Sequence, residues 1–343
     1  MEKCCFNCIN DNLLGIFIHK NGVFGNCDFC RCEDVKCINI NHEIFEKIFS
    51  FIKEMYIEHP IRRSRQLYYI VQSDWELLED SRYSEDLFRR LCEINGLDSE
   101  SYYIVNPDYR SLINIWDDYK DTIKHKHRFI NVLPKEIEDL FSTYIKERYK
   151  LLHRDNVMYR ARLGGKDQFG TLPFNAADMG IPPINKARAG RANPDGISYL
   201  YLASSEETAI AEVRPWSGSV VSVATVYLKE SQNTINFSVF HNKSILDYLD
   251  KKDYEGTINR IQFFNQLGIE LSRPVSPLDS YLEYIPTQFL TEFIKYQGFD
   301  GMIFDSSLGE GQNVVLFNEG DVDITQTELF RVESISYNFR DLN

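Results

Sequence analysis

Apolar residues recur at helical spacing through the stretch from Asn41 to His153. In the first run they share one face, which is formed by Ile44, Phe45, Ile48, Phe49 and Ile52. We expect Pro60 to end this helix. Residues 84–94 and 112–124 repeat the pattern, and Pro134 suits the first position of a last helix that runs on towards His153. The sequence therefore predicts a helical middle domain over residues 41–153.

Short apolar runs of strand length take over after residue 154. Strands are expected over residues 157–162, 199–203, 219–227, 302–305, 313–317 and 329–336, and helices over 205–213, 254–267 and 287–297. This alternation predicts a mixed α/β domain over residues 154–343, built around a twisted sheet. Residues 163–193 are rich in glycine and proline, and we expect them to fold over a cleft as a binding loop.

Seven of the eight cysteines lie before residue 38. Cys5-Phe-Asn-Cys8 and Cys27-Asp-Phe-Cys30 are two CxxC pairs whose separation lets two knuckles close a tetrahedral zinc site. Four thiolates leave no open position for a substrate, so zinc here is expected to be structural. The spacing alone does not fix the ligands, because Cys4 can replace Cys5, and Cys32 or Cys37 can replace a ligand of the second pair or enlarge the set.

The residues between these pairs complete a small module over residues 1–40. Residues 13–18 and the Asn21-Gly22 pair are expected to form a short strand and a turn, as in a zinc ribbon or knuckle. A redox role for either CxxC pair lacks the βαβ context that such a motif needs. The whole chain is thus predicted to be α+β, with a zinc-binding module, a helical middle domain and a C-terminal mixed domain.

Composition and charge restrict the function classes. A chain of 343 residues with 43% hydrophobic and 13% aromatic residues can fold into two or three domains with at least one sizeable core. A net charge of −13 disfavours broad binding to nucleic acid, although residues 125–128 or 146–154 can form local basic patches. No apolar run approaches the ~20 residues of a membrane span, and residues 1–5 do not resemble a signal peptide. We expect a cytoplasmic protein with reduced thiols.

The stretch from Arg191 to Pro215 combines an arginine, a tyrosine and a glutamate on a strand-then-helix frame. Tyr201 lies in the expected strand, and Ser204 or Ser205 can cap the following helix. Glu212 lies near the end of that helix among apolar residues, where an unpaired carboxylate is costly to bury. This set of side chains suits the binding of a dinucleotide.

Four segments in order resemble the RES domain, which is named after an arginine, a glutamate and a serine and is similar in fold to ADP-ribosyltransferases. They are Tyr159-Arg160-Ala161-Arg162, Gly190-Arg191, the strand and helix that end at Glu212, and the stretch from Gly298 to Phe317 that contains Ser306 and Asn313. The resemblance covers roughly residues 157–343. Asp305 stands where the family more usually has proline, which adds a negative charge near a diphosphate site.

The helical middle segment resembles the N-terminal domain that is often joined to RES domains and has been compared with the HEPN superfamily. HEPN nucleases carry an arginine and a histidine a few residues apart on one helix. Arg148 and His153 have that form, so RNA cleavage is one hypothesis for this segment.

The RES resemblance implies an enzyme that consumes NAD+ by cleaving the bond between nicotinamide and ribose. Glu212 would stabilise the positive charge that develops at the anomeric carbon, as a carboxylate does in glycoside hydrolysis. Arg160 and Arg191 would bind the pyrophosphate, with Arg162 as the alternative to Arg160. Tyr201 or Tyr199 would stack on nicotinamide or ribose. Ser306, rather than Ser307, and Asn313 would complete the pocket by hydrogen bonding.

Three functions follow, in order of preference. The first is a NAD+ glycohydrolase or phosphorylase that acts as a toxin or defence effector. The second keeps the fold and transfers ADP-ribose to a protein or nucleic acid, and the third is a non-enzymatic protein that binds RNA or a partner. Expected partners are NAD+, a cognate antitoxin or regulatory protein, and further copies of the chain in a homo-oligomer. Nucleic acid is not favoured, and no membrane is expected.

Overall fold

The computed structural model describes residues 2–60, 65–129, 132–144, 148–167, 171–238, 244–249, 254–273, 281–318 and 322–336. The chain divides into two compact units. Residues 1–114 and 240–263 form the first unit, and residues 115–239 and 264–343 form the second. This division does not follow the limits expected at residues 40 and 153, and those domain limits stay a prediction.

The first unit begins with a three-stranded antiparallel sheet. Strand β3 (Val35–Asn39) lies at its centre, with β1 (Lys3–Cys5) on one side and β2 (Val23–Gly25) on the other. The 3₁₀ turn η1 (Phe6–Cys8) follows β1 directly. Because β1 and β2 both pair with β3, the end of β1 lies beside the loop that follows β2.

Helix α1 (Asn12–Asn21) stands where a short strand and turn were expected, so that prediction was wrong. The Asp11 side chain accepts a hydrogen bond from the Leu14 N–H at 2.9 Å, which caps the first turn. Leu14 and Ile18, one turn apart, are both fully buried. The short apolar run was compatible with a strand or a helix. The N-cap and the buried side chains on one face favour the helix.

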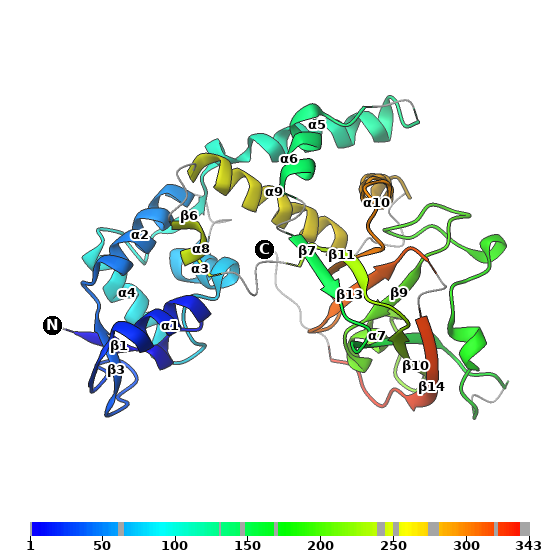
Figure 1. The fold of residues 1–343 in the computed structure, drawn as a ribbon, viewed down its shortest axis with the longest axis horizontal. Coiled ribbons are helices and arrows are strands. Elements are labelled where there is room, and N and C mark those ends of the chain that lie inside the picture. Colours follow the sequence, from blue (N-terminus) through cyan, green and yellow to red (C-terminus); the bar gives the residue numbers. More distant parts are fainter. Residues whose placement is uncertain are drawn as a thin grey trace. The chain divides into compact units, whose positions relative to one another are not determined.

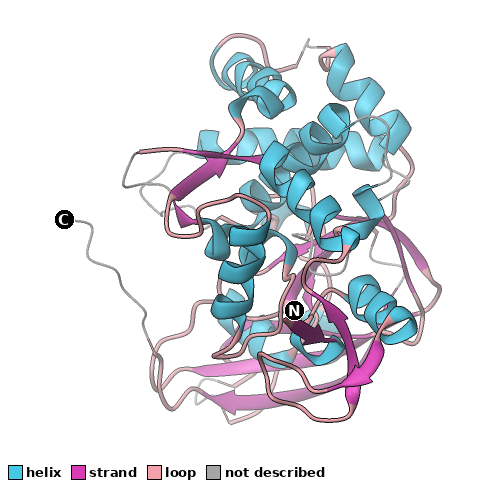
Figure 2. Ribbon diagram, turned by 90° about the vertical axis from the view of Figure 1, so that its left-hand side faces the viewer, coloured by secondary structure: helices cyan, strands magenta, loops and turns pink. Residues whose placement is uncertain are grey.

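The rest of the first unit is largely helical. Figure 2 colours the helices of the whole chain cyan. Its helices are α2 (Glu43–Met55), α3 (Leu67–Trp75), α4 (Ser84–Ile94) and α8 (Leu246–Leu249), with the 3₁₀ turn η2 (Pro107–Arg110). A small sheet of β4 (Tyr56–Glu58), β6 (Tyr102–Val105) and β5 (Arg65–Gln66) accompanies them. Helix α2 ends at Met55 rather than at Pro60, because Tyr56 already pairs with Val105 in this sheet.

The second unit is built on an eight-stranded sheet with the order β14-β10-β8-β9-β13-β12-β11-β7, and several of its strands are labelled in Figure 1. The strands are β7 (Tyr149–Leu152), β8 (Val157–Leu163), β9 (Leu200–Ala203), β10 (Val220–Leu228), β11 (Gln232–Asn236), β12 (Gly301–Asp305), β13 (Gln312–Leu316) and β14 (Val322–Arg331). All neighbours are antiparallel except β11 and β12.

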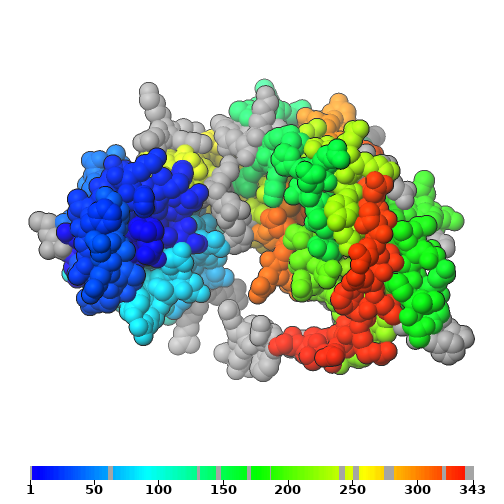
Figure 3. All heavy atoms as spheres, turned by 60° about the horizontal axis from the view of Figure 1, so that its bottom comes forward, coloured from blue at the N-terminus to red at the C-terminus, as the bar shows by residue number. Residues whose placement is uncertain are grey.

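Five of these strands were expected within about two residues of their observed bounds. Strand β14 begins at Val322, before the expected residues 329–336, and lies at the sheet edge, where most of its residues are exposed or half-buried (Figure 3, red). Strand β11 was missed. Strand β7 occupies residues that were assigned to the end of a helix, because Tyr149 and Leu152 pair with the β11 residues Ile235 and Gln232.

The second unit also contains helices. They are α5 (Ser111–His125), α6 (Lys135–Tyr144), α7 (Glu206–Glu212), α9 (Tyr254–Ser272) and α10 (Ile285–Tyr296). Helices α5 and α9 each begin in residues of the first unit and end in residues of the second. The described residues of this unit also include the 3₁₀ turns η4 (Ala176–Met179), η5 (Ile184–Lys186) and η6 (Tyr281–Tyr284). The predicted α+β class, with an N-terminal cysteine cluster, a helical region and a C-terminal mixed sheet, is confirmed.

Within the described ranges, no helix combines the length and the apolar character that crossing a bilayer requires.

Candidate functional site

The eight-stranded sheet opens between β8 and β9. Strand β8 pairs with β10 along seven residues, but with β9 it pairs only at Tyr159 and Ala203. Beyond this pair, the Arg160 Nη1 atom donates a hydrogen bond to the Tyr201 carbonyl at 2.9 Å, so a side chain joins the two strands. A cavity of about 380 Å³ lies here.

Five of the six residues expected to form the NAD+ site line this cavity. They are Arg160, Arg191, Tyr201, Glu212 and Asn313. The sixth, Ser306, is not a lining residue, but it contacts Glu212 directly. The Gly- and Pro-rich stretch also reaches the cavity, through Pro182 and several residues between 187 and 193. Segments far apart in the sequence thus converge on one concave surface.

Glu212 is the last residue of α7, the helix that packs against β8, β9 and β10. The helix starts at a Ser205 cap, whose Oγ accepts the Thr208 N–H at 3.1 Å. Glu212 Oε1 accepts hydrogen bonds from Ser306 Oγ at 2.6 Å and from Asn313 Nδ2 at 2.7 Å. Within the part of the chain that the structure describes, Oε2 accepts none. The carboxylate is therefore held through one oxygen.

Ser306 is oriented by its own loop. Its Oγ accepts the backbone N–H groups of Leu308 and Gly309, each at 3.1 Å, which leaves the hydroxyl proton to donate to Glu212. Ser307 is exposed instead. The loop lies tightly on α7, since a Cβ at Gly311 would stand 2.5 Å from Thr208 Oγ1. Of the two serines, Ser306 is therefore the one that contacts Glu212.

Arginines line the same cavity as the Glu212 carboxylate. Arg191 Nη1 donates to the Leu271 carbonyl at 2.5 Å. Burial lowers the pKa of the Arg191 guanidinium, and the Glu212 carboxylate opposes that shift. Arg162 is not at the cavity: its guanidinium lies over the Phe174 ring and donates to a backbone carbonyl.

Sequence reasoning missed two further lining arginines, Arg188 and Arg214. Arg188 lies three residues before Arg191 in the Gly- and Pro-rich loop, and Arg214 follows Glu212 by two residues, so both are close to residues that the sequence had singled out. Arg214 has φ of 48°, a left-handed conformation that is uncommon for residues other than glycine. Four lining arginines against one carboxylate favour an anionic ligand.

Tyr201 anchors the binding loop. Its hydroxyl donates to Asn193 Oδ1 at 2.6 Å and accepts the Ala192 N–H at 3.2 Å, and burial raises the pKa of this phenol. Asn193 Nδ2 in turn donates to the carbonyls of residues 188, 194 and 197. A Cβ at Gly190 would stand 2.8 Å from the Tyr201 hydroxyl, so only glycine fits there. The phenol of Tyr201 is therefore committed to the protein, although its ring lines the cavity.

Gln288 on α10 completes this anchor. Its Nε2 donates to the carbonyls of Gly190 at 2.8 Å and Asn193 at 3.0 Å. Nothing in the sequence marked this glutamine, whereas the Asn-Pro-Asp-Gly run from residue 193 carried a turn signal. Tyr199 also lines the cavity and packs its ring 5.0 Å from that of Phe317.

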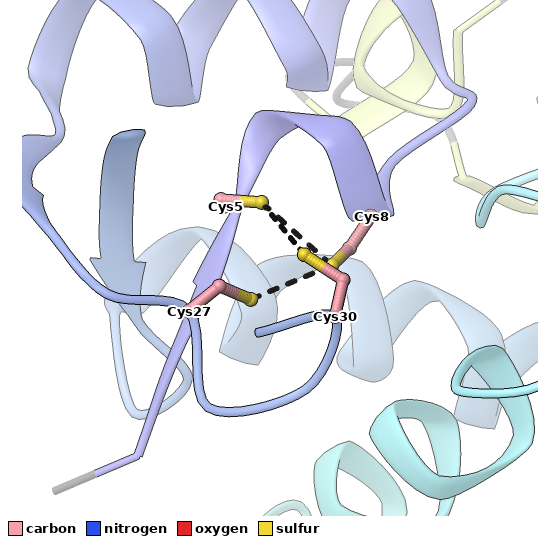
Figure 4. A group of neighbouring side chains, drawn as sticks. All are labelled: Cys5, Cys8, Cys27 and Cys30. Carbon is pink, nitrogen blue, oxygen red and sulfur yellow. Dashed lines mark hydrogen bonds between the residues drawn. The ribbon is translucent and has the colours of Figure 1, made fainter. Parts of the chain in front are cut away.

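Four cysteines come together in the first unit. The Sγ atoms of Cys5, Cys8, Cys27 and Cys30 all lie within 4.8 Å of one another, and their side chains point towards a common centre (Figure 4). Cys4, Cys32 and Cys37 are outside this group. The set that the CxxC spacing put first is the one that the fold assembles.

Arg148 and His153 do not share a helix, so the HEPN-like pairing inferred for them was wrong. Arg148 is buried, with its guanidinium 5.0 Å from the centre of the Phe264 ring. His153 follows strand β7 and is exposed. The residues between them form strand β7, which pairs with β11. The hypothesis of RNA cleavage by these two side chains is therefore not supported.

Two family models match this chain. The family model of the RES domain matches residues 158–337, and that of HEPN/RES N-terminal domain 1 matches residues 20–136. A chain in the crystal structure of the M. tuberculosis MbcT–MbcA toxin-antitoxin complex is 11% identical, with a TM-score of 0.32 over 56% of this chain and 93% of that chain. No curated protein matches the chain.

Proposed function

Because this chain belongs to the RES domain family, we propose that it consumes NAD+ by cleaving the bond between nicotinamide and ribose. The observation that carries the proposal is the Glu212 carboxylate, which Ser306 and Asn313 hold at the wall of a cavity that four arginines also line. A fixed anion beside several cations suits a ligand in which a diphosphate adjoins a positively charged nicotinamide ribose.

The reaction breaks one carbon–nitrogen bond. The electron pair of that bond leaves with the nicotinamide nitrogen, which becomes neutral, and positive charge develops on the anomeric carbon and ring oxygen of ribose. A carboxylate stabilises such an oxocarbenium-like state. Glu212 performs this role, and its preset hydrogen bonds mean that little reorganisation is needed when the charge appears. Water or phosphate then adds to the anomeric carbon and loses a proton.

The arginines bind the diphosphate. A guanidinium offers a planar fork of donors that matches phosphate oxygens, and it stays charged when partly buried. Arg160 and Arg191 come from a strand and from the anchored loop, so they approach the cavity from different segments. Tyr199 and Tyr201 supply aromatic surface for the nicotinamide riboside. A role as a growth-arresting toxin or defence effector, controlled by an antitoxin, rests on membership of the family alone.

The test is NAD+ consumption by the purified full-length chain, with products resolved by chromatography. The expected result is release of nicotinamide by the native chain and loss of at least about 100-fold in rate for Glu212→Gln. Glu207→Gln is the matched control, because Glu207 lies on the same helix but is exposed and does not line the cavity. Intact NAD+ after incubation with and without phosphate would refute the proposal.

The same experiment identifies the acceptor. ADP-ribose as sole second product indicates hydrolysis, and a phosphorylated product formed only when phosphate is added indicates phosphorolysis. Label from adenine-labelled NAD+ that remains with protein or nucleic acid after denaturation would instead indicate ADP-ribose transfer. Each outcome is compared with the Glu212→Gln chain under the same conditions.

A further inference from the structure

The four sulfur atoms of the cysteine cluster already stand at metal-binding separation. The Sγ–Sγ distances are 3.8 Å from Cys5 to Cys8, 3.4 Å from Cys5 to Cys30, and 3.6 Å from Cys8 to Cys27. A tetrahedron with zinc–sulfur bonds of ~2.3 Å has edges of about 3.8 Å. A disulfide needs ~2.05 Å, and all four cysteines are free thiols. The cluster therefore has the dimensions of a tetrahedral site.

Secondary structure presents these thiols from two knuckles. Cys5 ends β1 and Cys8 ends η1, while Cys27 and Cys30 lie in the loop after β2 (Figure 4). Strand β3 pairs with both β1 and β2 and so fixes one knuckle beside the other.

Burial makes an uncoordinated cluster unfavourable. Cys5, Cys8 and Cys27 are 0%, 5% and 2% exposed, and Cys30 is half-buried. Four thiols packed against one another offer weak donors and weak acceptors only. A divalent cation at their centre replaces these poor contacts with four strong bonds, and the four thiol protons pass to solvent as it binds.

We propose that Cys5, Cys8, Cys27 and Cys30 bind one zinc ion as thiolates, and that this zinc is structural. Four protein ligands close the coordination sphere, so no position is left for water or substrate. The first knuckle is joined to the loop between α3 and α4, because Ile9 forms a β-bridge with Leu78 and the Glu79 N–H donates to the Cys8 carbonyl. Zinc therefore crosslinks the two knuckles, and the first knuckle in turn holds this loop by backbone hydrogen bonds.

The first test is the metal content of the native full-length chain, purified under reducing conditions and dialysed. Elemental analysis is expected to give about one zinc per chain. Exchange with cobalt(II) is expected to give the visible absorption of a tetrahedral tetrathiolate complex. Neither measurement needs a variant, so misfolding of a variant cannot obscure the result. A chain that takes up neither zinc nor cobalt, or that holds iron in this site, would overturn the proposal.

The ligand set is tested by three serine variants. Cys27→Ser is expected to lose at least about nine-tenths of the zinc, whereas Cys32→Ser and Cys92→Ser should keep about one equivalent. Cys32 is the strict control because it follows the second CxxC pair closely without belonging to the cluster. Loss of zinc from Cys32→Ser, or its retention in Cys27→Ser, would refute the assigned ligands.

Discussion

The cysteine cluster and the Glu212 cavity are assembled in opposite ways. The four cysteines lie within twenty-six residues, and a three-stranded sheet is enough to bring them together. The residues around Glu212 come from segments between residues 160 and 313, and they meet only because an eight-stranded sheet opens between β8 and β9. One site is local and closed, whereas the other depends on the topology of a whole unit and has an accessible cavity.

The two sites also differ in how their side chains are held. In the cysteine cluster, polar contacts of the sulfur atoms join the cysteines to one another, and apolar side chains pack around them. In the Glu212 site, most of the key side chains are tied by another side chain or a carbonyl: Glu212 by Ser306 and Asn313, Tyr201 by Asn193, and Arg160 by the Tyr201 carbonyl. The first arrangement is expected to govern stability and the second to govern chemistry.

Metal removal gives the largest expected effect on the local site. Heating the native chain with excess chelator should lower its unfolding temperature by more than about 10 °C, because the free energy of binding structural zinc is also folding free energy. Scanning calorimetry with and without chelator measures this. The Cys27→Ser chain serves as the control and should not respond to chelator. An unchanged unfolding temperature of the native chain would contradict a stabilising role of metal at the cysteine cluster.

Glu212→Gln is expected to have the opposite profile. Glutamine keeps an oxygen that can accept from Ser306 and Asn313, so the unfolding temperature should stay within about 2 °C. The rate of NAD+ cleavage should fall by at least about 100-fold because the charge is gone. Initial rates and melting curves on the same preparation test both parts. A strongly destabilised variant would show that this carboxylate has a structural role instead.

The two sites also differ in how well the sequence alone predicted their residues. The CxxC spacing identified the four clustered cysteines, because their ligand geometry is encoded over a short stretch. Arg160, Arg191, Glu212 and Asn313 were found at the cavity through their resemblance to a family, since no local pattern joins residues 150 positions apart. Gln288 and Asn193 were missed, because they act on backbone carbonyls that only the folded loop brings near.

Tyr201 and Tyr199 differ in how their hydroxyl groups are held in the Glu212 site, and replacing each by phenylalanine tests this difference. Tyr201→Phe removes a donor and leaves buried Asn193 Oδ1 without it, which should cost about 2 kcal/mol of stability and raise KM for NAD+ several-fold as the loop loosens. Tyr199→Phe should be nearly neutral, because within the described residues its hydroxyl makes no hydrogen bond. Melting temperatures and kinetics of both variants decide this. Equal effects would contradict the anchoring role of Tyr201.

Arginine replacement is expected to give the smallest effect of the four. Arg160→Lys keeps the charge but loses the planar fork, so KM for NAD+ should rise about 10-fold, equal to ~1.4 kcal/mol. Arg162→Lys, two residues along the same strand and outside the cavity, should change KM less than about 2-fold. Steady-state kinetics on the two chains compare them. A larger effect at Arg162 would reverse the assignment of the first-strand arginine.

The hydrogen bond from Arg160 to the Tyr201 carbonyl has a consequence for dynamics. The guanidinium that we propose to bind a phosphate is also the side chain that joins β8 to β9 where their backbone pairing stops. A ligand that accepts hydrogen bonds from Arg160 competes with the Tyr201 carbonyl for the same guanidinium. Binding of the ligand in the cavity and separation of the two strands are therefore thermodynamically linked. Amide hydrogen exchange along β9 would then report ligand binding, even where the exchanging amides do not touch the ligand.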